Sequence, residues 1–268
     1  MMNFVENYCA YPAVLRRPMW RIWHNLLNRF DKDSAVNFMN YGYQGLNGDP
    51  ELKLEKKDEK DRYCIQLYHH LADSVDLQDK RVLEVGSGRG GGAHFIARYH
   101  KTKTYTGVDI SSGVIDFCNR FYSYPGLSFI EGRAEKVPFD GETYDAVINV
   151  ESARCYSNIF AFFKEVFRVL TPGGSFLFAD MIEKNEVQLI EKKLEAAGFE
   201  ILAKKDITPN VARGLELDSD RRKQLIRKKI PGLLKPSFEN FAGTKGTKRF
   251  ESFNNGRFVY KSYVLKRN

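Results

Sequence analysis

The sequence predicts an α/β fold, a mostly parallel sheet with helices on both faces, and three observations support it. From Lys80 onward, short apolar runs alternate with segments of helical periodicity, which is typical of parallel strands joined by helices. A glycine-rich stretch, RVLEVGSGRGGG at 81–92, begins with an apolar run. A last apolar segment, RFVYKSYVLKRN at 257–268, follows a long polar stretch and reads as a final strand.

The elements follow in chain order from this alternation. A C-terminal glycine closes the helix that ends at Gly198, and PGG at 172–174 predicts a turn before the next strand. We expect strands at 80–86, 104–110, 127 onward, 144–152, 175–182, 199–207 and 257–268, and helices at 64–75, 91–98, 111–122, 160–170 and 186–198.

Four regions are expected. Residues 1–75 form an N-terminal helical and aromatic cap, with a tryptophan-rich helix at 16–30, and residues 76–207 form the core. Residues 208–256 form a helical insert beside the acceptor pocket, and residues 257–268 complete the core sheet.

Composition narrows the class of protein. A chain of 268 residues, 43% hydrophobic, suffices for one substantial core. Four scattered cysteines without a CxxC pair indicate reduced thiols, and no metal site is expected. Without a secretory signal or a long apolar run, we expect a cytoplasmic protein, with peripheral membrane contact left open. The net charge is +8, but no nucleic-acid-binding motif accompanies it, so nucleic acid is not an expected partner.

The glycine loop predicts a place where backbone approaches a ligand. Gly86, Ser87, Gly88 and Gly90 follow Glu84 at the strand end, and glycines there allow unusual dihedrals and close contact. Asp109 and Ile110 end the next strand, with Asp109 nineteen residues after Gly90. A carboxylate in that place can accept from both ribose hydroxyls of a nucleoside, which suits NAD and S-adenosylmethionine (SAM) equally.

Motifs later in the chain distinguish between SAM and NAD as the expected cofactor. GRAEKVPF at 132–139, then FDGETYDAVINVES, an amphipathic helix and RVLTPGGSFLFAD at 168–180 form an ordered set that resembles the class I SAM-dependent methyltransferases. The resemblance implies a seven-stranded Rossmann-like sheet, SAM as cofactor and S-adenosylhomocysteine as product. It also implies that Arg133, Ala134 and Glu135 lie at the adenine, and that Asn149 and Val150 lie beside the cofactor.

A longer resemblance covers nearly the whole chain. LYHHLADSVDLQDKRVLEVGSGRGGGAHFIARY, INVESARCYSN and the C-terminal strand look like the methyltransferases that O-methylate phthiotriol and phenolphthiotriol dimycocerosates. This implies a hydrophobic, lipid- or polyketide-like alcohol as acceptor. Two alternatives stay open: a carbon methyltransferase on a sterol- or quinone-like molecule, and a catalytically inactive SAM-binding protein.

The chain departs from those relatives at two places. Arg133 stands where they have an aspartate, and we expect it to stack on the adenine while Glu135 supplies an acceptor. Arg154 stands where they have a histidine, and its guanidinium is a poor base because it stays protonated. Arg154 is therefore expected to bind an acidic group or to stabilise an oxyanion.

Other residues are candidates for the base and the pocket walls. Glu151 and His69 are the candidate bases, and with Arg154 they make up the predicted catalytic set. Tyr156 and His94 are expected in the acceptor pocket, and Tyr41 and Tyr43 are expected over the cofactor, since aromatic faces suit a sulfonium cation. The alternatives are packing of His69 and His94 on their helices and an aromatic plug in the cap for the two tyrosines.

Overall fold

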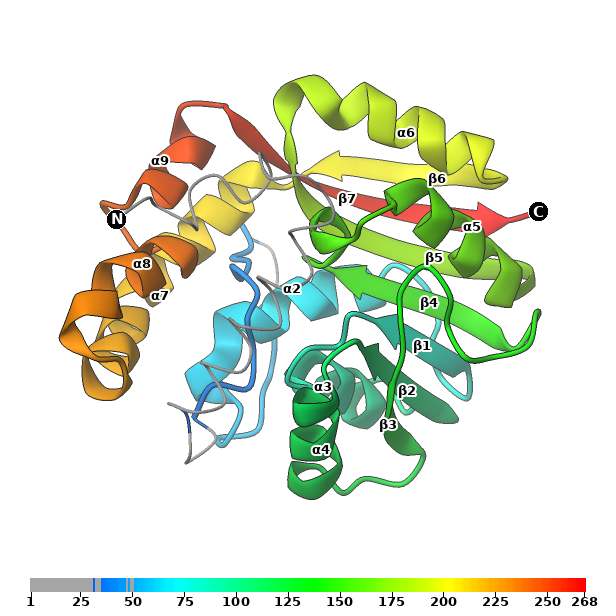
Figure 1. Cartoon of the computed structure of the whole chain (residues 1–268), viewed down its shortest axis with the longest axis horizontal. Coiled ribbons are helices and arrows are strands. Elements are labelled where there is room, and N and C mark those ends of the chain that lie inside the picture. The colour runs from blue at the N-terminus through cyan, green and yellow to red at the C-terminus, as the bar shows by residue number, and fades with distance from the viewer. Residues whose placement is uncertain (1–30, 32–34, 47, 49–50) are drawn as a thin grey trace.

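A computed structural model of the chain describes residues 31, 35–46, 48 and 51–268. Seven strands form one sheet in the order β3-β2-β1-β4-β5-β7-β6, in which β7 runs antiparallel to both neighbours and the other pairs are parallel (Figure 1). The predicted α/β class and its final strand are confirmed. The strands are β1 (Arg81–Val85), β2 (Thr104–Asp109), β3 (Leu127–Glu131), β4 (Tyr144–Val150), β5 (Leu170–Glu183), β6 (Phe199–Asp206) and β7 (Phe258–Arg267).

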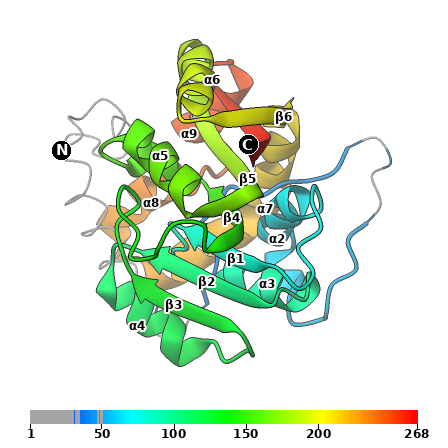
Figure 2. The same ribbon diagram turned by 90° about the vertical axis from the view of Figure 1, so that its right-hand side faces the viewer.

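Helices cover both faces of this sheet (Figure 2). One apolar cluster joins α2, α3 and α4 to the sheet and includes Leu67, Ile96 and Val114; another joins α5 and α6 and includes Phe162 and Leu194. Each helix turns an apolar stripe to the sheet, which is the usual reason for such layering. The helices of the core are α2 (Arg62–Ala72), α3 (Gly91–Tyr99), α4 (Ser112–Phe121), α5 (Ile159–Val169) and α6 (Val187–Ala196), with short 3-10 turns η2 (Glu59–Asp61), η3 (Ala153–Cys155) and η4 (Lys184–Glu186).

The predicted turn at 172–174 lies inside β5, which is a correction. Leu170 already pairs with Tyr144, and Ser175 pairs with Ala146. An advance of five residues along β5 therefore lies opposite an advance of two residues along β4. Gly173 has φ +77° in this bulge. Pro and Gly therefore mark a β-bulge here, because the chain returns to the same partner strand instead of leaving it.

The polar region before β7 is helical, as expected. It contains α7 (Thr208–Lys229), η5 (Gly232–Leu234), α8 (Lys235–Phe241) and α9 (Lys248–Asn254). Ile226, Ile230 and Phe238 form a small core of their own, against which Val36 and Met39 pack. The insert is thus joined to residues 35–46, which we call the strap.

The strap is neither helix nor strand. Its backbone is held by α2 and α7: Tyr43 N–H donates to Tyr63 O at 2.9 Å, and Gln44 N–H donates to Asn210 O at 3.0 Å. The part of the predicted helical and aromatic cap that the strap represents is therefore irregular in its backbone. The helix predicted at 16–30 lies outside the described residues.

Candidate active site

A cavity opens at the carboxyl ends of the parallel strands, where ligands bind in open α/β sheets. Its walls come from the loops after β1, β2, β3 and β4, from the strap and from α8. The lining residues are Asn37, Phe38, Met39, Asn40, Tyr68, Val85, Gly86, Ser87, Gly88, Arg89, Gly91, Gly92, Val108, Asp109, Ile110, Ser111, Gly132, Ala134, Glu135, Val150, Glu151, Ser152, Arg154, Cys155, Tyr156 and Phe241.

The glycines of the loop after β1 allow other segments to come close. A Cβ on Gly86, at φ +78°, would lie 2.3 Å from Ser152 Oγ. A Cβ on Gly90, at φ +77°, would lie 2.8 Å from atoms of Phe129 and Tyr122. Gly90 is not part of the cavity wall, so its role is to turn the chain into α3.

Most amides of this loop are already bonded, contrary to the expectation that they would face a ligand. Five donors have acceptors within the protein. They are Gly86 and Ser87, which donate to Val108 O (2.7 and 3.0 Å), Gly88 to Asp109 Oδ2 (3.0 Å), Gly90 to Ser87 O (3.0 Å) and Gly91 to Asn37 O (3.2 Å). Because phosphate-binding loops leave such donors open, this loop is better suited to a cofactor without phosphate than to a dinucleotide.

Asp109 is held rigidly at the end of β2. Its Oδ2 accepts from Gly88 N–H and its Oδ1 from Ser111 N–H, both at 3.0 Å. The residue is buried and lines the cavity with Ile110. Each carboxylate oxygen keeps a second lone pair, so the side chain can still accept from a diol.

The predicted adenine contacts are only partly brought to the cavity. Ala134 and Glu135 line it, whereas Arg133 is exposed and lies outside the wall. Glu135 Oε1 accepts from the Ser157 N–H at 3.1 Å and from its Oγ at 2.6 Å. Stacking of Arg133 on an adenine gains no support from this placement.

The loop after β4 is anchored on β1. Asn149 Nδ2 donates to Val85 O at 2.8 Å, to Ser152 Oγ at 2.7 Å and to Tyr156 OH at 3.0 Å. Tyr156 and Val150 line the cavity, as expected, while Asn149 lies behind the wall and positions them.

Glu151 lies at the centre of a buried charged cluster. Its Oε1 accepts from Tyr41 N–H at 2.7 Å and from Tyr260 OH at 2.9 Å, and its backbone has φ +54°. Its Oε2 has no hydrogen bond and lies 3.5 Å from Arg154 Nη2. Positive φ is unusual for a residue other than glycine, and such strain is found at functional sites.

Arg154 is bound to Asp180. Its Nη1 donates to Asp180 Oδ1 at 2.6 Å and its backbone N–H to Oδ2 at 3.1 Å. Burial raises the pKa of both Glu151 and Asp180, although Arg154 opposes it. Burial acts to lower the pKa of Arg154, but Asp180 and Glu151 hold this pKa well above its usual value. Two carboxyl groups thus share one permanent cation.

The two candidate histidines are not brought to the cavity. His69 packs on α3, with ring centroids 6.4 Å from Phe95 and 5.8 Å from His100. The His94 ring packs at a tilt against Tyr122, with centroids 4.8 Å apart, and burial lowers the pKa of His94 to about 4. Helix packing accounts for both, so we do not retain His69 as a base or His94 in the acceptor pocket.

The tyrosines of the strap do not cover the cavity either. Tyr41 supplies its N–H to Glu151 while its ring packs on Phe253 at 5.6 Å, and Tyr43 stacks on His70 at 4.7 Å. Neighbouring strap residues do line the wall, namely Asn37, Phe38, Met39 and Asn40. The strap therefore contributes to the cavity wall through residues 37–40, and not through the two tyrosines.

Glu84 supports the wall from behind. The fully buried carboxyl accepts from Tyr68 OH at 2.8 Å and from Tyr105 OH at 3.0 Å, and burial raises its pKa to about 8. Tyr68 lines the cavity whereas Glu84 does not. A direct cofactor contact by Glu84 is not seen in this arrangement.

Arg89 was missed in the sequence because it lies between glycines. It is buried, lines the cavity and donates to Val36 O at 2.6 Å and to Asp31 at 2.9 Å. Asp31 also pairs with Lys229 at 2.7 Å. The glycine loop, the strap and α7 are thereby joined through buried charges.

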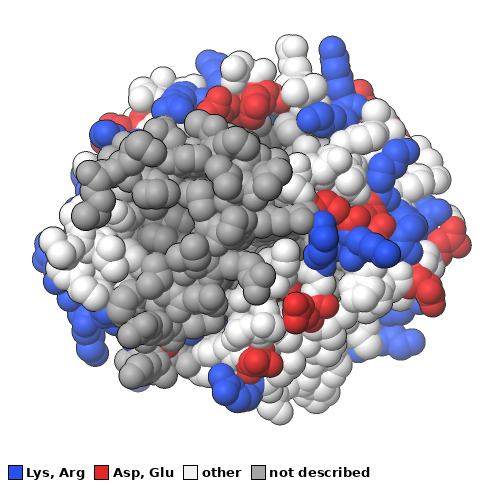
Figure 3. Space-filling model, in the orientation of Figure 1, with Lys and Arg blue, Asp and Glu red and all other residues white. Residues whose placement is uncertain are grey.

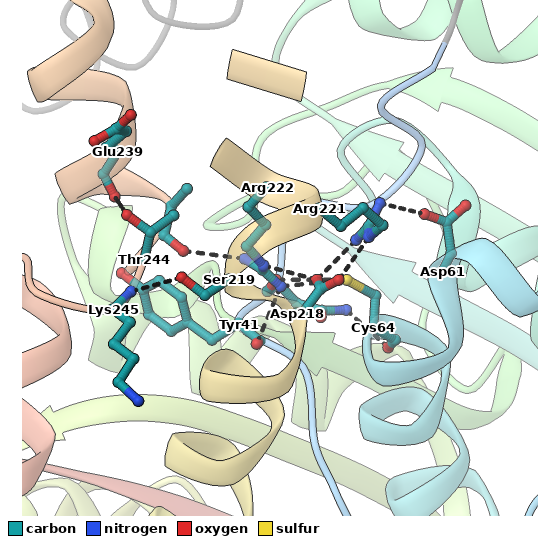
Figure 4. A network of polar contacts seen from close by, with 12 residues as sticks. Tyr41, Asp61, Cys64, Asp218, Ser219, Arg221, Arg222, Glu239, Thr244 and Lys245 are labelled. Atoms are coloured by element: carbon teal, nitrogen blue, oxygen red, sulfur yellow. Dashed lines mark hydrogen bonds and ion pairs between the residues drawn. The ribbon is translucent and has the colours of Figure 1, made fainter. Parts of the chain in front are cut away.

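A second network joins α7 to the strap (Figure 4). Arg222 Nε donates to Asp218 at 2.8 Å, and its Nη2 donates to Asn40 O at 3.0 Å and Tyr41 O at 3.1 Å. Arg221 bridges Asp218 to Asp61. Because Tyr41 N–H binds Glu151, the insert fixes the backbone that orients this carboxylate.

Several residues of the wall carry buried polar atoms without a hydrogen bond. They are Ser87 Oγ, Asn37 Oδ1, Asn40 Oδ1 and Glu151 Oε2, of which the last forms an ion pair with Arg154. Such atoms are rare in folded proteins and call for a partner. Together with the fixed carboxylate of Asp109, they suit a ligand that carries hydroxyl and amino groups, as SAM does.

Comparisons with known proteins place these observations in a family. Residues 83–178 match the model of a methyltransferase domain. The phthiotriol/phenolphthiotriol dimycocerosates methyltransferase of Mycobacterium tuberculosis is 37% identical over 92% of this chain and 91% of its own. A fatty-acid O-methyltransferase of Mycolicibacterium smegmatis is 38% identical over 87% and 84%.

Solved structures share the fold. Geranyl diphosphate C-methyltransferase from Streptomyces coelicolor, with S-adenosyl-L-homocysteine bound, has a TM-score of 0.67 at 18% identity over 96% of this chain and 100% of its own. The [4+2]-cyclase SpnF has 0.68 at 20% identity over 93% and 94%. The fold alone thus leaves the reaction open, whereas the sequence relatives are named as methyltransferases. The chain belongs to the SAM-dependent class I methyltransferases, in the group that contains the phthiotriol/phenolphthiotriol dimycocerosates methyltransferases.

Proposed function

We propose that this enzyme transfers the methyl group of SAM to a hydroxyl of a hydrophobic, lipid- or polyketide-like molecule, with Glu151 as the base. The observation that carries the proposal is the arrangement of Glu151, a residue of the cavity wall: its Oε1 is fixed by Tyr41 and Tyr260, while its Oε2 has no hydrogen bond and only the ion pair with Arg154. One oxygen holds the side chain in place, and the other is left to receive a proton.

The part of the cavity formed by the loops after β1, β2 and β3, which we call the cofactor half, supports the proposal that SAM binds there. When bound, SAM supplies a methyl group already activated on a sulfonium centre, so the protein's main task is alignment. We assign Asp109 to the ribose hydroxyls, Ala134 to the adenine edge, and the loop of Gly86, Ser87 and Gly88 to the methionine part. Their shared place at the strand ends supports these assignments.

The part of the cavity formed by the strap, the loop after β4 and α8, which we call the acceptor half, suits an alcohol as acceptor better than a carboxylic acid. An alcohol must lose its proton to become a methyl ether, and a positioned base typically adds about 10²–10⁴-fold to such a rate. The proton moves from the hydroxyl to Glu151 Oε2 as the oxygen takes the methyl group in place of the sulfur, which leaves S-adenosylhomocysteine as the second product. A carboxylate substrate needs no base and favours a free cation, yet Arg154 is bound to Asp180 and faces Glu151. We therefore assign Arg154 to positioning Glu151, and not to substrate binding.

The apolar side chains at the cavity suit the hydrophobic acceptor that the relatives' names indicate. Phe38, Met39 and Phe241 lie opposite the strand ends, contributed by the strap and α8. No helix within the described residues is long and apolar enough to cross a membrane. Contact with a membrane surface is a separate question.

The test is product analysis with SAM labelled by ¹³C at the methyl group. The purified enzyme would be offered a long-chain secondary alcohol and the fatty acid of equal length, in separate reactions. We expect the methyl carbon signal of an ether from the alcohol and little ester from the acid. Mainly ester, or a new carbon-bound methyl on a sterol- or quinone-like acceptor, would contradict the proposal. SAM binding without turnover on any of them would indicate an inactive relative.

A further inference from the structure

The end of the insert combines basic charge with an exposed apolar apex. Residues 223–236, KQLIRKKIPGLLKP, join α7 to α8, and we call them the corner. The corner contains five basic residues and neither Asp nor Glu. Figure 3 shows Lys and Arg side chains at the left edge of the molecule, where Figure 1 places this connection.

Leu233 forms the apex of the corner. Its side chain is 93% exposed, whereas the next most exposed large apolar residues of the described chain, Leu202 and Leu189, are 53% and 50% exposed. Pro231 and Gly232, which precede Leu233, are exposed as well. A single exposed leucine is common on protein surfaces, but one at the tip of a basic, acid-free connection is a different arrangement.

The basic side chains of the corner fall into two groups. Lys229 pairs with Asp31, and Lys223 Nζ donates to Lys245 O, so these two serve the fold. Arg227 and Lys228 are exposed, and neither forms an ion pair with any described residue. Lys235, on the other side of Leu233, has no ion pair among the described residues either. Three basic residues without an ion pair among the described residues thus lie within six positions of Leu233 in the sequence.

The inward face of the corner connects it to the cavity. Ile226, Ile230 and Phe238 pack on Met39 of the strap, and Met39 lines the cavity. Phe241, at the end of α8, also lines the cavity. The basic apex and the proposed acceptor wall are therefore parts of one packed unit.

We propose that the corner docks the enzyme on an anionic lipid surface, with Leu233 inserted between headgroups and Arg227, Lys228 and Lys235 bound to phosphates. Cations near an anionic bilayer are attracted within a Debye length, and a small apolar insertion adds to the binding without a membrane span. Nucleic acid would account for the cations but not for an apolar apex among them. Vesicle binding needs no methyl transfer, so this proposal stands or falls independently of the proposed function.

The test is sedimentation of the full chain with vesicles of phosphatidylcholine and phosphatidylglycerol at 70:30, compared with phosphatidylcholine alone. We expect binding to the mixed vesicles that weakens strongly at high salt. The double substitution Arg227→Glu and Lys228→Glu should weaken the partition roughly tenfold or more, and Leu233→Ser should weaken it several-fold. The matched controls lie on α6 and β6: Lys192→Glu with Lys205→Glu, and Leu202→Ser.

Each outcome decides the proposal. Loss in the corner variants with little change in the controls supports it. Equal loss in both sets, no vesicle binding by the unaltered chain, or full binding by the corner variants would overturn it. A shift of the unaltered chain to a dimer that the Leu233 variant loses, in the absence of vesicle binding, would indicate a second copy as the occupant. Calorimetric SAM affinity, expected unchanged in every variant, reports whether the variants are folded.

Discussion

The two halves of the cavity are built in different ways. The half that we assign to the cofactor consists of short contiguous loops directly after β1, β2 and β3, whose backbone is bonded to neighbouring strands. The acceptor half joins the strap, the loop after β4 and α8, which are far apart in the chain. Cofactor binding is therefore expected to depend on local geometry, and methyl transfer on long-range packing.

Two buried carboxyl groups illustrate the same contrast. Glu84 has both oxygens engaged by tyrosine hydroxyls and does not line the cavity. Glu151 lines the cavity, with one oxygen engaged by hydrogen bonds and the other held only by an ion pair with Arg154. Burial raises the pKa of both carboxyl groups, so what distinguishes the proposed base from the structural carboxyl is its place at the cavity.

The largest effect is expected from Asp109→Ala. The substitution removes two charge-assisted acceptors for the ribose and frees the N–H groups of Gly88 and Ser111. Charged hydrogen bonds contribute about 1.5–3 kcal/mol each, so SAM affinity should fall about 100-fold or more in calorimetry. Asp109→Asn, which keeps the shape, should lose less. An affinity within threefold of the unaltered enzyme would remove Asp109 from the site.

A smaller effect, on the other half, is expected from Arg222→Met. Loss of its bonds to Asn40 O and Tyr41 O loosens the backbone that holds Glu151. We expect kcat to fall roughly tenfold, since about 1.4 kcal/mol of alignment corresponds to that factor, with SAM affinity nearly unchanged. Arg213→Met, on the exposed part of the same helix, is the control. Equal loss of SAM affinity and kcat would show that the halves are not separable.

The smallest effect on SAM binding and kcat is expected from Glu84→Gln, which instead changes the pH dependence of stability. The folded pKa is about 8 and the ordinary value is 4.5, so between these values the folded state binds more protons than the unfolded state. The stability that this carboxyl contributes is present below pH 4.5 and is lost as pH rises through 8, by at most about 1.4 kcal/mol per pH unit. Denaturant unfolding of the Gln variant should lack this part of the slope. An unchanged slope would mean that Glu84 titrates normally.

Much of the fold could be predicted because it follows from local patterns. Alternating apolar runs identified the strands of the sheet, and the glycine loop and Asp109 pointed to residues that line the cavity. The bulge at 172–174 was taken for a turn, since Pro and Gly serve both purposes and only strand pairing distinguishes them.

The acceptor half was less predictable, because its contacts are non-local. Glu151 was recognised from its place at a strand end, but its fixation by Tyr41 and Tyr260 joins residues more than a hundred positions apart. Arg89 and Arg222 carry no motif, and their partners are mostly backbone carbonyls and buried aspartates. His69 was a candidate base and His94 a candidate pocket residue by residue type alone. Both side chains instead pack against other aromatic rings.

The most direct test of the account is the pH dependence of methyl transfer at saturating SAM and alcohol, for the unaltered enzyme and for Glu151→Gln. Transfer requires the deprotonated carboxylate, and burial raises the pKa of Glu151 above its ordinary value. The rate should therefore fall as pH decreases through a pKa above 4.5, and the Gln variant should lose about 10²–10⁴-fold in kcat together with this pH dependence, while it still binds SAM. The same acidic limb in the Gln variant, or a kcat within a few-fold of the unaltered enzyme, would contradict the role of Glu151 as the base.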